Sequence, residues 1–271
     1  GTAVSLPLSI YRVNCMIPTL RSVFGLEGRI ALVTGSSRGI GAAIARGLAG
    51  AGADVVVHGS TKGGTTQVAA DIRASGRKSW EVAGDLAEPR SGRLLIEAAN
   101  ELAGQIDILV INASAQINAE LADLTPADIE TQINVNLNAT IEMLQSTLPT
   151  MAEQGWGRVI NIGSINQSRP KAIVTAYAAT KAAQHNIIQS QAREYAARGV
   201  LLNTLAPGLV DTDRNAARKA NDPAGWQDYV NQLNWMGRAG LPNEMVGAAI
   251  FLASDACSFI TGETVLITGG Y

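Results

Sequence analysis

The stretch Arg29-Ile-Ala-Leu-Val-Thr-Gly-Ser-Ser-Arg-Gly-Ile-Gly-Ala-Ala-Ile-Ala-Arg-Gly-Leu48 decides the fold. An apolar strand runs into a glycine-rich turn with the spacing G-x-x-x-G-x-G, and an Ala-rich helix follows. Glycine lets the backbone approach a pyrophosphate closely, and a helix N-terminus presents amide donors and the positive end of the helix dipole. The order of strand, turn and helix therefore predicts a dinucleotide-binding site.

Apolar β-rich runs alternate with helical patterns along the rest of the chain. This alternation predicts an α/β fold, a single-domain doubly wound Rossmann fold with an about seven-stranded parallel sheet and helices on both faces. Ligands of such sheets bind beyond the carboxyl ends of the strands, where the strand order reverses. The expected strands are residues 30–34, 54–58, 79–83, 106–111, 158–163, 200–205 and 264–268.

Composition narrows the class of protein. A chain of 271 residues with 46% hydrophobic content and no Pro/Ser-rich linker can bury one sizeable core, so we expect one domain over residues 25–271. A net charge of −2 with scattered Lys and Arg argues against nucleic-acid binding. Cys15 and Cys257 lack metal-ligand spacing, which predicts no metal site and suits a reducing cytoplasm. No apolar segment reaches the roughly 18 residues of a membrane span, so we expect no membrane partner and a cytoplasmic location.

Residues 1–24 precede the predicted domain. They lack the charged start and long apolar stretch of a secretory signal. We expect an N-terminal extension, natural or left from cloning, that is either disordered or packed on the surface.

A second motif, Tyr177-x-x-x-Lys181, lies in an Ala-rich segment that predicts a helix over residues 177–198. Residues four apart lie on one helix face, so the phenol and the ammonium become neighbours. A phenol titrates near pH 10 in water, and a nearby positive charge favours its ionised form. Ser164, at the end of an apolar run, would hold a substrate oxygen. Alone the tetrapeptide is typical of any amphipathic helix, but with the glycine-rich turn it indicates a proton-transfer site.

Several motifs together resemble the short-chain dehydrogenase/reductase family, in its single-domain oxidoreductase branch, over about residues 26–271. One departure is Ile111-Asn-Ala-Ser114, where the family usually has Asn-Asn-Ala-Gly, and the extra side chain narrows the space beside a nicotinamide. The matching motifs are Thr34-Gly35-x-x-x-Gly39-Ile40-Gly41, Asp85-Leu86, Asn112-Ala113, Asn136, Ser164, Tyr177-x-x-x-Lys181 and the turn Pro207-Gly-Leu-Val-Asp-Thr212.

The resemblance implies an enzyme, an NAD(P)-dependent dehydrogenase or reductase that acts on CH–OH groups. Tyr177 would exchange the proton on oxygen, and Lys181 would lower the pKa of Tyr177 and hold the nicotinamide ribose. Ser164 would polarise the substrate oxygen. Asn136 would anchor a water beside Lys181 and complete a proton relay, although a helical Asn is commonly a surface residue or bonded to its own helix.

The resemblance also implies a cofactor site at the carboxyl ends of the strands. Asp85 and Leu86 would bracket the adenine, and Asp85 also fits a helix N-cap with Glu88 as its capping-box partner. The expected cofactor-binding residues are Gly35, Ser37, Arg38, Gly39, Ile40, Gly41, Ser60, Thr61, Asp85, Leu86, Asn112, Ala113, Ser114, Tyr177, Lys181, Pro207, Gly208, Val210 and Thr212.

The end of the second expected strand bears on cofactor choice. Gly59 stands where an NAD-selective site commonly has a carboxylate that would repel a 2′-phosphate. Ser60 and Thr61 can donate hydrogen bonds to a phosphate, and Arg38, with Lys62 assisting, can supply charge. NADP(H) is therefore favoured over NAD(H). A solvated Arg38 is the alternative, since NAD-using relatives also carry arginine there.

The expected substrate follows from the segment 211–236, where family members carry a mobile lid. Its Asn, Gln and Trp residues suit a small polar substrate, namely a sugar, polyol, sugar acid or keto acid. One alternative is a 3-oxoacyl carrier-protein reductase of fatty-acid synthesis, against which we count the low charge of Gly155-Trp-Gly157. A non-catalytic NADP(H)-binding sensor is the other alternative. The four expected catalytic residues argue against a sensor, which needs no proton donor.

The apolar C-terminal run, residues 259–271, bears on assembly. In relatives it packs at a subunit interface, and an exposed apolar terminus is costly. We therefore expect a homotetramer or homodimer, with the closure of one sheet edge as the alternative role of this strand.

Overall fold

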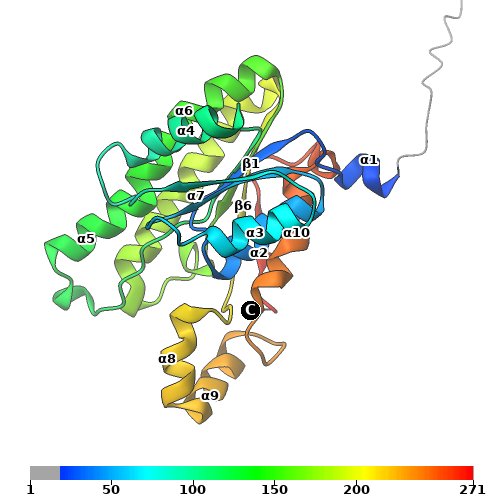
Figure 1. The fold of residues 1–271 in the computed structure, drawn as a ribbon. Coiled ribbons are helices and arrows are strands. Elements are labelled where there is room, and N and C mark those ends of the chain that lie inside the picture. Colours follow the sequence, from blue (N-terminus) through cyan, green and yellow to red (C-terminus); the bar gives the residue numbers. More distant parts are fainter. Residues whose placement is uncertain (1–18, 271) are drawn as a thin grey trace, which may run out of the picture.

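The computed structural model describes residues 19–270, and they contain a seven-stranded sheet whose pairings are all parallel (Figure 1). The strand order is β3-β2-β1-β4-β5-β6-β7, so the direction of winding reverses between β1 and β4. The strands are β1 (Ile30–Val33), β2 (Asp54–Gly59), β3 (Ser79–Ala83), β4 (Ile108–Ile111), β5 (Gly157–Ile162), β6 (Val200–Pro207) and β7 (Thr264–Ile267).

Helices cover both faces of the sheet. On one face lie α2 (Gly39–Gly50), α3 (Thr66–Ala74) and α10 (Val246–Ala253), and on the other lie α4 (Ser91–Ala103), α6 (Ala139–Gln154) and α7 (Thr175–Tyr195). Further helices are α1 (Leu20–Phe24), α5 (Pro126–Ile133), α8 (Asp213–Asn221) and α9 (Pro223–Leu233). Short helical turns cover Leu121–Asp123, Ile165–Gln167, Ala172–Val174, Ala196–Arg198, Pro242–Met245 and Asp255–Cys257, and Asn134–Asn138 form a π-helix.

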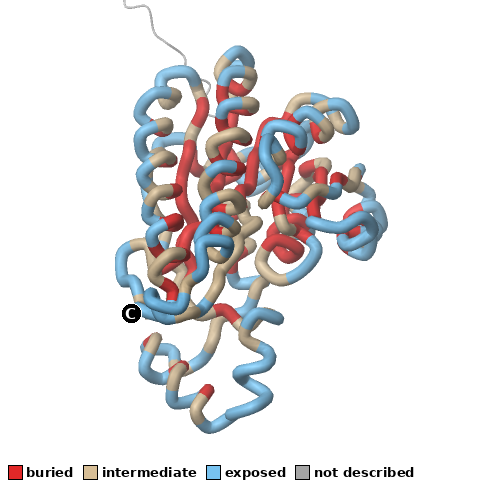
Figure 2. Tube along the Cα trace, turned by 90° about the vertical axis from the view of Figure 1, so that its left-hand side faces the viewer, coloured by how far each residue is buried: buried red, intermediate tan, exposed pale blue. Residues whose placement is uncertain are grey.

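The strand sequences explain the two layers. Successive side chains of a strand point to opposite faces of the sheet. In β1, Ala31 and Val33 pack in the core beneath α2, α3 and α10, whereas Leu32 packs in the core beneath α4, α6 and α7. The residues of β1, β2, β4, β5 and β6 are nearly all buried (Figure 2), which is why these strands read as largely apolar runs.

The predicted fold class is confirmed, with small differences at the strand ends. β4 begins at Ile108 and not at residue 106, and β6 extends to Pro207. Of the expected N-terminal extension, residues 1–18 lie outside the described residues, and α1 falls in the remainder. Within residues 19–270, no helix is both long and apolar enough to span a membrane.

The helices α8 and α9 project beyond the carboxyl ends of the strands (Figure 1). We call these helices and their flanking loops, residues 211–236, the α8–α9 segment. No residue of α8 is buried, and α9 buries only Trp226 and Val230. The segment coincides with the predicted substrate lid and contributes little to the core.

Candidate active site

A cavity of about 790 Å³ opens at the carboxyl ends of β1, β4 and β5, where the winding reverses. Every predicted catalytic or cofactor-binding residue lines it except Thr61 and Asn136. The fold therefore brings together residues that lie far apart in the chain, from Gly35 to Thr212.

The glycine-rich turn forms one wall of the cavity. Gly35 has φ +61° and Gly39 has φ +57°, a left-handed conformation that favours glycine. A Cβ on Gly35 would also lie 2.9 Å from the Cα of Ala113. The N-cap of α2, Arg38, makes no side-chain cap hydrogen bond, so the first amides of α2 have no side-chain acceptor. These features fit the pyrophosphate of a dinucleotide.

Asn112 and Thr34 lock the ends of β1 and β4 together. The Asn112 Nδ2 donates to the carbonyls of Thr34 and Gly35 at 2.9 and 3.0 Å. The Thr34 hydroxyl oxygen accepts from the backbone N–H of Asn112 at 2.9 Å and of Ala113 at 3.0 Å. The turn that would hold the cofactor is thereby fixed to the neighbouring strand.

His58 is a residue of this wall that sequence reasoning missed. Its Nδ1 accepts from the backbone N–H of Gly35 at 3.1 Å, and its Nε2 lies 2.9 Å from the carbonyl oxygen of Gly84. The two bonds together require the neutral tautomer with the proton on Nε2. Burial lowers the pKa of His58, which favours this neutral form. The available signal was a lone histidine ending the buried run Val55-Val-Val-His58.

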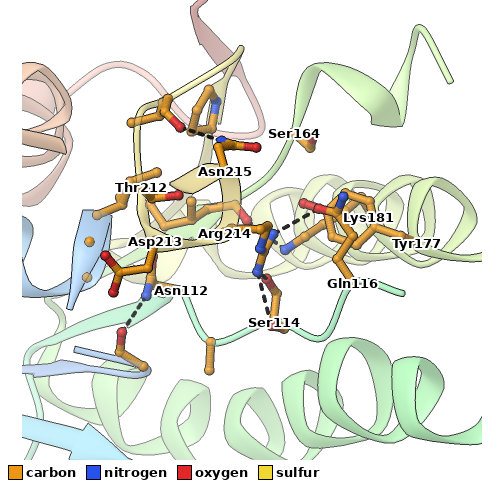
Figure 3. A pocket seen from close by; sticks show the side chains of 18 of the residues that line it. Asn112, Ser114, Gln116, Ser164, Tyr177, Lys181, Thr212, Asp213, Arg214 and Asn215 are labelled. Atoms are coloured by element: carbon orange, nitrogen blue, oxygen red, sulfur yellow. Dashed lines mark hydrogen bonds between the residues drawn. The ribbon is translucent and has the colours of Figure 1, made fainter. Parts of the chain in front are cut away.

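Ser164, Tyr177 and Lys181 meet on the opposite wall, from the end of β5 and from α7 (Figure 3). The predicted helix is confirmed: α7 carries Tyr177 and Lys181, and a short turn continues it to Arg198. The Ser164 Oγ accepts from the backbone N–H and the Nδ2 of Asn166 at 3.2 and 3.3 Å. Because both lone pairs of Ser164 are used, its O–H is free to donate into the cavity.

The environment sets the protonation of the two groups on α7. Burial raises the pKa of Tyr177, and the charge of Arg214 and hydrogen bonding from Ser164 act in the opposite direction. Burial lowers the pKa of Lys181 to about 7, with Arg214 contributing. The Lys181 Nζ donates to the Ile162 carbonyl at 2.8 Å and lies 5.8 Å from the centroid of the Tyr177 ring.

That Lys181 lowers the pKa of Tyr177 stays a prediction. Lys181 is fully buried, and this burial disfavours its ammonium form. The groups that favour the phenolate are Arg214 and Ser164.

Asn136 does not line the cavity. It is fully buried in the π-helix, where its Oδ1 accepts from the Ala115 N–H at 2.8 Å. Its Nδ2 donates to the Ala115 carbonyl at 2.8 Å and to the Thr180 hydroxyl at 2.9 Å. Asn136 thus ties the loop after β4 to α7. Thr61 also lies outside the cavity lining. Its backbone carbonyl accepts a hydrogen bond from the backbone N–H of Gly64.

Replacing Asn136 by Ala is expected to lower the free energy of unfolding by about 1–3 kcal/mol, because two half-buried backbone groups of Ala115 and the buried Thr180 hydroxyl lose their partner. Urea denaturation monitored by circular dichroism measures the loss. Asn138→Ala is the matched control, since the Asn138 side chain is exposed and bonds only Asn134 at 2.8 Å. Equal stability of Asn136→Ala and the wild type would contradict this structural role.

Arg214 lies in the expected substrate lid and was not among the predicted catalytic or cofactor-binding residues. From α8 its Nη1 donates to the Gln116 Oε1 at 2.9 Å, and its Nη2 donates to the Ser114 Oγ at 3.3 Å (Figure 3). Ser114 is the residue that departs from the family pattern, and its hydroxyl here faces an arginine of the α8–α9 segment. No sequence pattern indicated the hydrogen bonds from Arg214 to Ser114 and Gln116.

A model of the family described as short chain dehydrogenase matches residues 29–223. The chain belongs to this family. Membership confirms the predicted enzyme class, a dehydrogenase or reductase that acts on CH–OH or carbonyl groups, for which dependence on NAD(P) is general.

Two solved members of the short-chain dehydrogenase family are similar to the chain throughout. A 3-oxoacyl (acyl-carrier-protein) reductase from Agrobacterium tumefaciens C58 with NADP bound shares 65% identity and a TM-score of 0.92, covering 97% of this chain and 100% of that one. A gluconate 5-dehydrogenase from Burkholderia cenocepacia J2315 in complex with NADP and tartrate shares 36% identity and a TM-score of 0.85, covering 92% and 97%.

Curated relatives carry the same two activities. The 3-oxoacyl-[acyl-carrier-protein] reductase of Vibrio harveyi is 37% identical over 245 residues, which are 90% of this chain and 98% of that protein. The gluconate 5-dehydrogenase of Gluconobacter oxydans is 33% identical over 248 residues, which are 92% and 96% of the two chains. The chain is thus similar to enzymes with two different substrate classes.

Proposed function

We propose that this short-chain dehydrogenase interconverts a secondary alcohol and a carbonyl on a small polar substrate, with NADP(H) as cofactor. The observation that carries the proposal is the meeting of Ser164, Tyr177 and Lys181 on one wall of the cavity that the glycine-rich turn also lines. A sugar, polyol, sugar acid or keto acid fits the polar residues that surround these three.

The proposed roles follow from the contacts. The Ser164 O–H, whose acceptor lone pairs are used by Asn166, donates to the substrate oxygen. Tyr177 gives the proton to that oxygen in reduction and takes it in oxidation. Protonated Lys181 supplies positive charge beside the phenol and binds the nicotinamide ribose. The nicotinamide, when bound, supplies or accepts the hydride.

We further propose that Arg38 selects NADP(H). Arg38 and Ser60 line the cavity at the ends of β1 and β2. The Nε of Arg38 lies 3.6 Å from the Asp213 Oδ2, and both side chains are largely exposed, so this ion pair is weak. Arg38 is therefore available to a 2′-phosphate. The NADP bound to the Agrobacterium and Burkholderia relatives supports the choice.

Replacing Arg38 by Ala is expected to lower the preference for NADPH over NADH by about 10–100-fold, because a phosphate loses a charge-assisted partner. The ratio of kcat/KM for the two cofactors measures it. Arg46→Ala is the matched control on the same helix, since Arg46 pairs with Asp71 at 2.7 Å and does not line the cavity. An unchanged ratio in Arg38→Ala would reassign Arg38 to the solvated surface.

A second candidate is reduction of a 3-oxoacyl thioester, which the 65% identity to a reductase of that name favours. The sequence-based argument against it was wrong. Residues 155–157 lie at the start of β5, the end of the strand opposite the cavity, where Arg29 and Arg158 flank the Trp156 ring. Their low charge therefore has no bearing on substrate entry.

The deciding experiment follows NADPH and NADH absorbance with a panel of aldoses, polyols, sugar acids, keto acids and 3-oxoacyl thioesters. Turnover of a small polar substrate supports the first proposal, and turnover of thioesters alone supports the second. Tight NADPH binding with no turnover of any compound would favour the non-catalytic sensor.

We also propose that the protein assembles as a homotetramer or homodimer in the cytoplasm. β7 is an edge strand, and Leu266 on it and Phe259 before it are exposed. Exposed apolar side chains at a sheet edge suit burial against a second copy. Light scattering of the purified protein measures the mass of the assembly and so the number of chains in it.

A further inference from the structure

Positive charge gathers at the end of the cavity away from the adenine. Among the described lining residues the carboxylates are Asp85 and Asp213, and Asp213 faces Arg38. The cations Lys171, Lys181, Arg214 and Arg218 also line the cavity, and none of them belongs to an ion pair of the described residues. Cations without a carboxylate partner in a cleft attract anionic ligands.

Tyr229 of α9 organises the outer part of this positive region. Lys171 donates from its Nζ to the Tyr229 hydroxyl at 2.9 Å. The Arg218 guanidinium stacks on the Tyr229 ring, 3.7 Å from the centroid. An aromatic ring holds both cations in place without neutralising them, so their charge remains available to an incoming anion.

Arg214 forms the inner part, next to the reacting group. Ser114 and Gln116 hold its two terminal nitrogens from the loop after β4. The same guanidinium acts on Tyr177 both by charge and by hydrogen bonding. A planar guanidinium with donors to spare binds a carboxylate in a bidentate manner.

We propose that the substrate carries a carboxylate within one or two carbons of the reacting carbon, and that Arg214 binds this carboxylate. Because Tyr177 must reach the reacting oxygen, a carboxylate on the neighbouring guanidinium cannot be far along the carbon chain. The substrate class is therefore a short 2- or 3-hydroxy acid or the matching oxo acid. This inference rests on the proposed function, whose substrate it narrows.

The test compares short 2- and 3-hydroxy acids, including tartrate, with their primary amides, which keep the shape and lose the charge. With NADP⁺, the wild type is expected to prefer an acid over its amide by about 100-fold in kcat/KM. Arg214→Gln is expected to reduce this preference to about threefold or less, and Arg214→Lys, which keeps charge but not the fork, to restore part of it.

Lys219→Gln is the matched control. Lys219 is a cation of the same helix that pairs with Asp211 at 2.6 Å and does not line the cavity. The acid preference of this variant should match the wild type. Loss of the preference in Lys219→Gln as well as in Arg214→Gln would show long-range attraction and overturn a direct contact with Arg214.

Binding without turnover separates this inference from the proposed function. The quenching of NADPH fluorescence by the same acids and amides measures ternary complexes. Acid binding that Arg214→Gln weakens, without turnover of any compound, would retain the anion site and reject the oxidoreductase proposal. The inference would be overturned if acids and amides bound or reacted equally well, or if no acid bound. This holds even if the protein proves to be an active oxidoreductase.

Discussion

Tyr177→Phe is expected to lower kcat/KM by about 10³-fold or more, while the Kd for NADPH changes by less than about threefold. The substitution keeps the buried ring and removes only the O–H. General acid–base catalysis contributes roughly 10²–10⁴-fold in enzymes, and this contribution is lost with the phenol O–H. Steady-state kinetics and NADPH fluorescence titration measure the two quantities.

Tyr195→Phe is the matched control for Tyr177→Phe. Tyr195 ends the same helix, contacts Arg198 at 4.8 Å from its ring centroid and does not line the cavity. The variant Tyr195→Phe should keep the kcat/KM and the NADPH Kd of the wild type. If Tyr177→Phe retained more than about a tenth of the activity, another proton donor would have to be found.

Lys181→Met is expected to lower the activity and to raise the stability of the protein. We expect kcat/KM to fall by about 10²–10³-fold, because the charge beside Tyr177 and a ribose contact are lost together. We expect the free energy of unfolding of the cofactor-free protein near pH 7 to rise by about 2 kcal/mol. Burial disfavours the Lys181 ammonium, and Met fills similar space without that cost.

The stability difference between Lys181→Met and the wild type should depend on pH. The pKa of Lys181 is lowered from 10.5 to about 7 in the folded protein. Between these values the unfolded chain binds a proton that the folded chain has lost, so the stability of the wild type rises with pH across this window. The advantage of Lys181→Met should therefore shrink from pH 7 towards pH 10.

Urea denaturation over that range tests the argument, with Lys219→Met as the control because Lys219 is half-exposed. A stability difference between Lys181→Met and the wild type that stays constant with pH would mean that Lys181 titrates normally.

Local patterns predicted the sheet, and the resemblance to the family supplied most of the cavity lining. Each strand of a doubly wound sheet is buried on both faces, so continuous apolar runs such as Ile30–Val33 are legible in the sequence. The topology then brings every strand end to one edge. That rule placed Gly35, Asp85 and Ser164 together although nothing local connects them.

Contacts that depend on side-chain direction were not predictable in this way. His58 and Arg214 act through partners 23 and 98–100 residues away, and no spacing rule links them. The pKa of Lys181 depends on burial, which the helical pattern of α7 does not reveal. Asn136 was identified by resemblance, but no pattern indicated the π-helix around it or its contacts with Ala115 and Thr180.

The bond from Gly35 to His58 makes the cofactor turn sensitive to acid. An imidazolium has no lone pair for the Gly35 N–H, so protonation at Nδ1 would place two donors face to face. Since the pKa of His58 lies below its ordinary value of 6.5, the unfolded chain takes up this proton first, and stability falls as the pH drops below that value. Acid would therefore loosen the glycine-rich turn that is proposed to hold the cofactor.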